Sequence, residues 1–119
     1  MKVTIIGGGN MGGAIARGLA KGSIVKAEDI TVSDPFQGLL DALKADCPEI
    51  NVTNNNEEAI VGADIVMLAV KPWLVEKILS TLNLDPTRQI FVPIAAGIGF
   101  DKLSKWVAPG IPILRVMPN

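Results

Sequence analysis

Histidine is absent from this sequence of 119 residues, and cysteine occurs once, at Cys47. Without histidine, the chain lacks the commonest general acid or base and the commonest metal ligand. A single cysteine excludes an internal disulfide and a cysteine-rich metal site. Any chemistry must therefore come from a bound cofactor, from Lys, Asp or Glu side chains, or from residues outside this chain.

Charge of one sign and long apolar runs are also scarce. The chain has 11 basic and 12 acidic residues, a net charge of −1, and no basic cluster, which argues against a nucleic acid partner. No apolar run reaches membrane-spanning length, and the N-terminus resembles a strand rather than a signal peptide, so we expect a cytoplasmic protein. With only two Trp and three Phe, the core must consist of Ile, Val, Leu and Ala, which suits a buried parallel sheet.

The most informative segment that is present covers residues 3–12. A β-branched apolar run leads into Gly7-x-Gly9-x-x-Gly12, and a helical pattern follows. In dinucleotide-binding turns the first glycine permits the tight turn, the second lets a pyrophosphate approach the backbone, and the third lets the helix pack on the strand. The helix N-terminus then presents free N–H groups to the phosphates. The segment predicts a dinucleotide site at Gly7, Gly8, Gly9, Asn10, Met11 and Gly12.

Strands and helices alternate along the rest of the chain. We expect helices at residues 10–21, from 34–35 onward, at 57–61, from 72 onward and at 101–107, and strands at residues 2–6, 30–33, 50–53, 63–70, 89–95 and 113–117. This alternation indicates an α/β fold over residues 1–119, a doubly wound, Rossmann-like parallel sheet in the order 3-2-1-4-5-6. In such a sheet the ligand lies where the order reverses, between the first and fourth strands.

Finer expectations concern packing within these elements. Helical spacing predicts that the first helix buries Met11, Ala14, Ile15, Gly18 and Leu19, and that the helix opened by Pro72 buries Leu74, Val75, Ile78, Leu79 and Leu82. Pro93 has no N–H to donate, so the fifth strand should be irregular there. Asn10 suits the N-cap position of the first helix as well as a contact with the cofactor.

The turn at Ser33, Asp34 and Pro35 is the second candidate binding segment. Asp34 lies 22 residues after Gly12, close to the spacing of the acidic residue that binds the adenosine ribose. Alternatively, Asp34 is the N-cap of a helix with Pro35 in its first position. No Lys or Arg occurs from Thr31 to Leu43, so we expect NADH to be used at least as well as NADPH.

The whole sequence resembles the pyrroline-5-carboxylate reductase family. The resemblance rests on residues 5–12, on Ala63-Asp64 leading to Ala69-Val70-Lys71-Pro72, on Ala95-Ala96-Gly97, and on Met117-Pro118-Asn119. It implies NADPH or NADH as cofactor. It places Asn56 at the adenosine, Ala69, Val70, Lys71 and Pro72 along the ribose and nicotinamide, and Ala95 and Ala96 beneath the nicotinamide.

The same resemblance implies the reduction of a small molecule, 1-pyrroline-5-carboxylate, to L-proline, the last step of proline biosynthesis. It further implies a carboxyl-terminal helical domain that forms a homo-oligomer and completes the substrate site, so the sequence is expected to be a piece of a longer protein. No catalytic side chain is assigned, because that helical domain is expected to hold most of the substrate. Lys71 is not expected to act as an acid, because its ammonium would repel a cationic iminium substrate. Two other functions stay open: another reductase of the 6-phosphogluconate-dehydrogenase-like group, and a non-catalytic nucleotide-sensing module.

Overall fold

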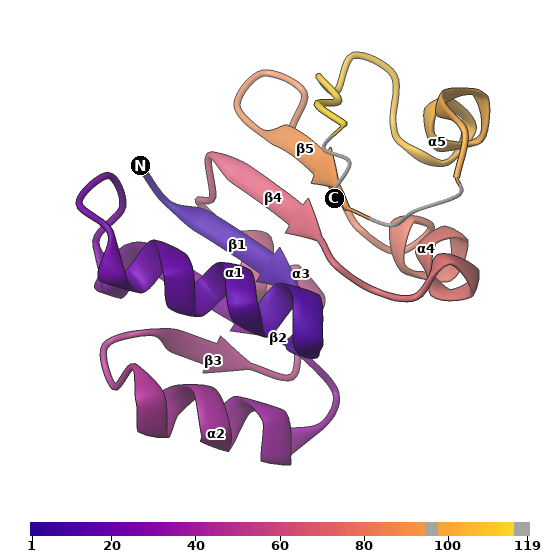
Figure 1. Ribbon diagram of the computed structural model, residues 1–119. Coiled ribbons are helices and arrows are strands. Elements are labelled where there is room, and N and C mark those ends of the chain that lie inside the picture. The colour runs from indigo at the N-terminus through magenta and orange to yellow at the C-terminus, as the bar shows by residue number, and fades with distance from the viewer. Residues whose placement is uncertain (95–97, 116–119) are drawn as a thin grey trace.

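A computed structural model describes residues 1–94 and 98–115 (Figure 1). Its parallel sheet has the order β3-β2-β1-β4-β5, with strands β1 (Val3–Ile6), β2 (Ile30–Ser33), β3 (Asn51–Thr53), β4 (Ile65–Leu68) and β5 (Ile90–Pro93). The helices are α1 (Asn10–Lys21), α2 (Gln37–Asp46), α3 (Asn56–Ile60), α4 (Pro72–Leu79) and α5 (Phe100–Trp106), with a 3₁₀ turn at Ala27–Asp29. The predicted doubly wound fold is therefore confirmed, as is the order of its first five strands.

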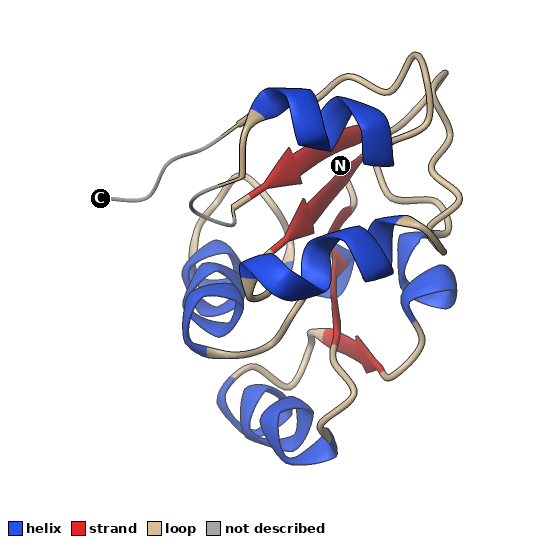
Figure 2. Cartoon of the chain, turned by 90° about the vertical axis from the view of Figure 1, so that its right-hand side faces the viewer, coloured by secondary structure: helices blue, strands red, loops and turns tan. Residues whose placement is uncertain are grey.

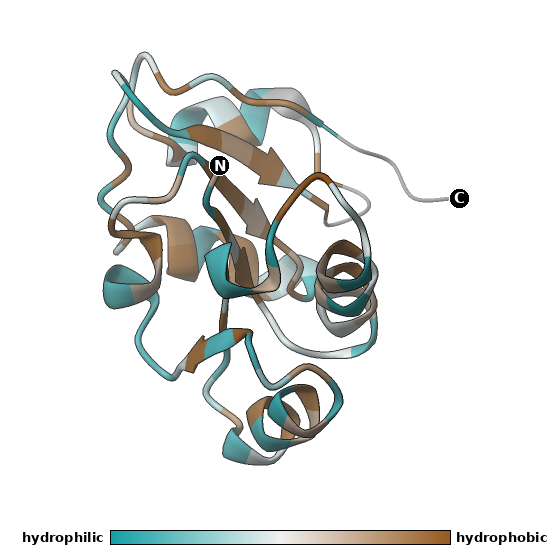
Figure 3. Cartoon of the chain, turned by 90° about the vertical axis from the view of Figure 1, so that its left-hand side faces the viewer, coloured by the Kyte–Doolittle hydropathy of each residue, from teal (hydrophilic) through white to brown (hydrophobic). Residues whose placement is uncertain are grey.

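Helices cover both faces of this sheet (Figure 2). On one face α1 and α2 pack against Ile5 and Val32, and on the other α3, α4 and α5 pack around Ile6, Leu68 and Phe91. The apolar strands lie between helices whose outer surfaces carry polar residues (Figure 3). Because strand side chains alternate between the faces, a sheet covered on both sides needs strands that are apolar throughout. Among the described residues, no helix is both long and apolar enough to cross a bilayer.

The sheet is smaller than the sequence predicted. Of the expected sixth strand, the described residues form one parallel bridge, between Ile113 and Phe91, and residues 116–119 lie outside the description. The expected fourth strand at residues 63–70 is also shorter, because its ladder with β1 runs only from Ile65 to Leu68. An apolar run thus marks the buried segment but overstates the length that is paired.

The expected irregularity at Pro93 is wrong. Pro93 is the last residue of β5 and lies in register with Leu68 of β4. The N–H of Ile94 donates to the Leu68 carbonyl, whereas the N–H of Phe91 donates to the Pro112 carbonyl on the other side of β5. Since N–H groups alternate in direction along a strand, the nitrogen of Pro93 faces the side of Phe91. Its missing donor therefore leaves the ladder with β4 intact.

The buried face of α1 also differs from the prediction. Gly12, Gly13 and Ala16 are buried, whereas Met11 is 44% exposed. Ala14 and Gly18 are likewise exposed, and only Ile15 and Leu19 of the expected set pack against the core. Small residues let the helix backbone approach the sheet closely, so the buried residues of α1 are glycine and alanine rather than large apolar residues. In α4, Val75 and Leu79 are buried as predicted, but Leu74 is 38% exposed.

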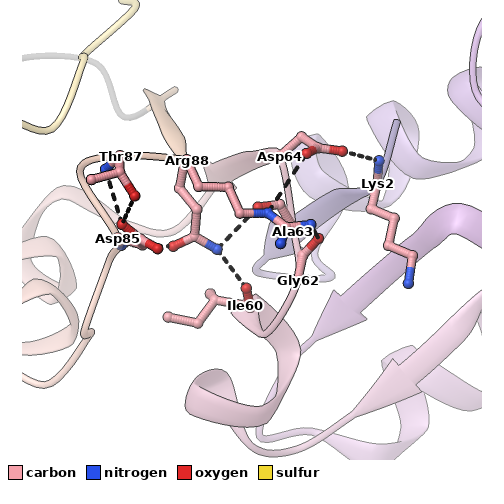
Figure 4. A network of polar contacts seen from close by, with 9 residues as sticks. Lys2, Ile60, Gly62, Ala63, Asp64, Asp85, Thr87 and Arg88 are labelled. Carbon is pink, nitrogen blue, oxygen red and sulfur yellow. Dashed lines mark hydrogen bonds and ion pairs between the residues drawn. The ribbon is translucent and has the colours of Figure 1, made fainter.

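One buried polar side chain, that of Gln89, connects the segment before β5 to the end of α3 and to the loop before β4, at Ile60 and Ala63, which Figure 4 labels. The Nε2 group of Gln89 donates to the carbonyl oxygens of Ile60 at 2.6 Å and Ala63 at 3.0 Å. Its Oε1 atom accepts from the N–H of Asp85 at 3.0 Å. Gln89 is only 4% exposed, and its buried amide is paired with these three backbone groups.

Candidate functional site

The first turn of the chain connects the end of β1 to α1 and lies beside the end of β4. Gly7 has a φ of +108°, and a Cβ placed on it would lie 2.3 Å from the carbonyl oxygen of Ala69. A Cβ on Gly12 would lie 1.8 Å from the carbonyl oxygen of Gly7. The turn and the close packing predicted for the first and third glycines are therefore confirmed.

Gly9 is the N-cap residue of α1, so the alternative in which Asn10 caps this helix is wrong. The first N–H groups of a helix have no acceptor within it, and Gly9 has no side chain to cap them. The first turn carries no acidic residue, and a Cβ on Gly9 would meet no atom within 4 Å. The residues present therefore fit an anion, with open space in front of Gly9 and helix donors behind it.

Asp34 joins this glycine turn to the turn after β2. Its Oδ2 atom accepts from the N–H of Gly8 at 2.7 Å, and its Oδ1 atom accepts from the N–H of Phe36 at 2.8 Å. The alternative in which Asp34 caps the second helix is wrong, because α2 begins at Gln37 with Phe36 as its N-cap. Asp34 is 7% exposed, and its carboxylate holds both turns in place.

Two of the three consecutive asparagines after β3 support the same turn. The buried Ser33 hydroxyl donates to Oδ1 of Asn56 at 2.6 Å, and Nδ2 of Asn54 donates to the Asp34 carbonyl at 2.9 Å. Asn55 instead caps α3, with its side chain accepting from the N–H of Glu58. The structure thus brings Ser33, Asp34 and Asn56 together.

A cavity of about 550 Å³ lies at the carboxyl ends of β1, β2 and β4, where the strand order reverses. The predicted site residues that line it are Gly7, Met11, Ser33, Asp34, Pro35, Asn56, Ala69, Val70 and Lys71. Those that do not line it are Gly8, Gly9, Asn10, Gly12 and Pro72. Gly8 is buried, with its N–H directed to Asp34. Ala95 and Ala96 lie outside the described residues.

Sequence reasoning missed the remaining lining residues, Ile6, Phe36, Leu39, Asn54, Leu74, Lys77, Ile78 and Thr81. Four of them, Leu74, Lys77, Ile78 and Thr81, have the i, i+3, i+4, i+7 spacing of one helix face. That face of α4 and the residues just after it border the cavity, which explains why Leu74 is partly exposed. The predicted topology could have indicated these residues of α4, because a helix that follows β4 begins beside the cavity.

A glycine turn after β1 and a cavity at the reversal of strand order together define a dinucleotide-binding domain of the Rossmann type. Comparison with known proteins specifies the family. Residues 2–97 match the family described as NADP oxidoreductase, coenzyme F420-dependent, and the chain belongs to this family.

Relatives over the whole chain are pyrroline-5-carboxylate reductases, which confirms the resemblance seen in the motifs. The enzyme of Methanosarcina acetivorans is 35% identical over 119 residues, which cover 99% of this chain and 44% of that protein. The structure of a pyrroline-5-carboxylate reductase from Coxiella burnetii matches with a TM-score of 0.86 at 30% identity, over 99% of this chain and 44% of that one.

A second solved relative, the pyrroline carboxylate reductase of Plasmodium falciparum, has NADP bound. It matches with a TM-score of 0.84 at 28% identity, over 100% of this chain and 42% of that one. The chain spans about two-fifths of the length of the curated relatives that it matches, with coverages of 41%, 44% and 43% in three of them.

Proposed function

We propose that this chain is the cofactor-binding part of an enzyme that reduces 1-pyrroline-5-carboxylate to L-proline with NADPH or NADH. The observation that carries the proposal is the cavity at the reversal of strand order, bordered by Gly7 just after β1 and by Ala69, Val70 and Lys71 after β4. Its support is the alignment of this chain, along its full length, with pyrroline-5-carboxylate reductases. A bound nicotinamide dinucleotide supplies the hydride for such a reduction.

We assign the binding of the cofactor to two turns, one after β1 and one after β2. The backbone from Gly9 to Gly12 holds the pyrophosphate, since its N–H groups and the helix dipole favour an anion. Gly8 shapes this turn rather than contacting the ligand, because its N–H already donates to Asp34, whereas Gly7 borders the cavity. The adenosine ribose lies at Ser33, Asp34, Pro35 and Asn56.

The nicotinamide end extends along Ala69, Val70, Lys71 and Pro72 toward Ala95 and Ala96. Lys71 is exposed and is the N-cap residue of α4. Its ammonium orients the cofactor or attracts phosphate, because near the reacting carbon it would repel a cationic iminium. The substrate's carboxylate and ring nitrogen are held mainly by a helical domain beyond this chain, which also forms the homo-oligomer. We place the protein in the cytoplasm.

Calorimetric titration of the 119-residue chain with NADPH and NADH tests the binding part of the proposal. The chain should bind at least one of them and form no proline from 1-pyrroline-5-carboxylate. An absence of binding to both cofactors would refute the proposed site. Appreciable proline formation by this chain alone would refute the division of labour between two domains.

The full-length protein tests the reaction. NAD(P)H oxidation should depend on 1-pyrroline-5-carboxylate and yield proline in equal amount. Oxidation of a β-hydroxyacid with NAD(P)+, or reduction of coenzyme F420 by NADPH without any reduction of the imine, would instead assign another activity of the 6-phosphogluconate-dehydrogenase-like group. Cofactor binding without any turnover would favour a nucleotide-sensing module.

A further inference from the structure

Phe36 is an aromatic side chain in an exposed position beside the cavity. It is 68% exposed, although burying such a side chain would be worth about 1.5–3 kcal/mol. Trp73 is also exposed, at 76%, but it does not line the cavity. Among the aromatic side chains that the structure describes, Phe36 alone combines exposure with a place in the cavity lining.

The backbone of Phe36 is fixed by the same group that fixes the glycine turn. Asp34 accepts the Phe36 N–H at 2.8 Å and the Gly8 N–H at 2.7 Å. The position of Phe36 relative to the proposed pyrophosphate site is therefore set by one carboxylate. Pro35 immediately before it further restricts the backbone, because the proline ring fixes φ.

Apolar side chains come from both flanks of the cavity. Phe36 and Leu39 follow β2, and Leu74 and Ile78 belong to α4, which follows β4. Because β1 lies between β2 and β4 in the sheet, these two pairs flank the glycine turn. A slot with apolar sides and an aromatic ring at its edge suits a flat, weakly solvated group, and a purine base is such a group.

We propose that Phe36 stacks on the adenine base of the bound nucleotide, with Leu39, Leu74 and Ile78 completing the slot. This inference rests on the proposed function, because it takes the ligand to be an adenine dinucleotide. It assigns Phe36 to affinity for the adenine half and gives it no part in the reaction. Adenine nucleotides that lack nicotinamide, such as ADP-ribose, should therefore bind the chain through the same contact.

Calorimetry of the 119-residue chain with ADP-ribose and NADH tests this assignment. Phe36→Ala should raise the Kd of both probes about tenfold, as expected for the loss of one base–aromatic contact. Phe36→Tyr keeps the ring and should bind like the unmodified chain, whereas Phe36→Leu should bind less well because it keeps apolar bulk but loses the ring. Ile24→Ala removes an 86% exposed side chain outside the cavity lining and is the matched control.

A spectroscopic signature separates stacking from general apolar cover. Titration with ADP-ribose should shift the Phe36 ring resonances by the ring current of adenine, and nicotinamide mononucleotide should leave them in place. A Kd within twofold of the unmodified chain for Phe36→Ala, or unshifted ring resonances, would overturn the inference. If ADP-ribose and NADH bind but Phe36→Ala has no effect, the proposed function stands and only the stacking role falls. If neither probe binds the unmodified chain, both fall.

Discussion

The carboxylate of Asp34 accepts a hydrogen bond from the N–H of Gly8 at 2.7 Å, across 26 positions of sequence. This bond connects the turn after β1 to the turn after β2. It also directs the Gly8 N–H into the protein, away from the open space in front of Gly9. The carboxylate therefore has a structural role in the glycine turn in addition to any contact with a ribose.

Removal of this carboxylate should destabilise the chain. Asp34→Ala leaves the buried Gly8 N–H without its acceptor, and we expect a loss of about 2–3 kcal/mol in the free energy of unfolding. Asp34→Asn keeps one carbonyl oxygen as an acceptor, so its loss in the free energy of unfolding should be smaller. Urea denaturation measures both. Asp46→Ala breaks an exposed ion pair with Arg17 and should cost less than about 1 kcal/mol. Equal losses for Asp34→Ala and Asp46→Ala would contradict the role assigned to Asp34.

Gly9→Val should abolish binding of NADH and NADPH while the chain stays folded. A side chain at Gly9 points into open space where the pyrophosphate is proposed to lie. We expect no backbone strain in Gly9→Val, because φ at Gly9 is −74°, a value that residues other than glycine also adopt. Gly18→Val, in the same helix and with an open Cβ position, is the control and should bind normally. Calorimetry decides, and normal binding by Gly9→Val would show that the phosphates lie elsewhere.

Gly12→Ala should have the opposite outcome, a loss of stability. Its Cβ would lie 1.8 Å from the Gly7 carbonyl oxygen, so α1 must move away from β1. We expect a cost of about 3 kcal/mol in the free energy of unfolding, in the range of overpacked cores. Gly18→Ala meets no atom and should instead stabilise α1 by about 0.5–1 kcal/mol. Thermal or urea unfolding of the two variants would refute the packing argument if both behaved alike.

The first five strands could be predicted because they depend on local patterns, and their order and the place of the cavity follow from the general topology of an alternating α/β fold. The β-branched run before Gly7 and the apolar run before Lys71 mark β1 and β4 directly. The buried face of α1 was mispredicted because helical spacing selects Met11, Ala14 and Gly18, which are exposed, and does not select Gly13 and Ala16, which are buried. Close approach of backbones depends on missing side chains, which a hydrophobic pattern does not register.

Most internal hydrogen bonds of the candidate site could not be predicted, since those from Gly8 to Asp34, from Ser33 to Asn56 and from Asn54 to Asp34 join separate turns. Asp34 and Pro35 have the local signature of a helix start, but the Asp34 carboxylate accepts from Gly8 and Phe36, and α2 begins only at Gln37. Likewise, Lys77 belongs to the site because α4 packs beside the cavity, a tertiary fact that its neighbours in sequence do not indicate. The residues of α4 were missed for this reason, whereas Ile6 and Phe36 were missed although they adjoin the predicted site residues Gly7 and Pro35.

Gln89→Leu should destabilise the sheet at the start of β5. The substitution keeps the bulk but leaves the carbonyl oxygens of Ile60 and Ala63 without their donor (Figure 4). We expect a loss of about 2–3 kcal/mol in the free energy of unfolding. Gln37→Leu removes an exposed amide bonded to Asp41 and should change stability by no more than about 0.5 kcal/mol. A similar result for both variants in urea denaturation would refute the contribution of the buried amide.

The charges around the cavity decide the preference between NADH and NADPH. We predict that NADH is used at least as well as NADPH, because Asp34 places a carboxylate where a 2′-phosphate would arrive and no Lys or Arg lies between Thr31 and Leu43. The structure adds an opposing charge, since Lys77 lines the same cavity from α4. Coulomb attraction from Lys77 should reduce the discrimination, so the expected result is a bias rather than exclusion.

Two substitutions separate these opposing charges. Asp34→Asn should shift the ratio of kcat/KM values toward NADPH, and Lys77→Gln should shift it toward NADH, when full-length enzyme is assayed with both cofactors. Lys44→Gln, on α2 and outside the cavity lining, is the control and should leave the ratio unchanged. A preference of the unmodified enzyme for NADPH above tenfold, about 1.4 kcal/mol, would contradict the prediction. Because Asp34 is held by Gly8 and Phe36, that result would mean that the cations of α4 outweigh a carboxylate fixed in the site.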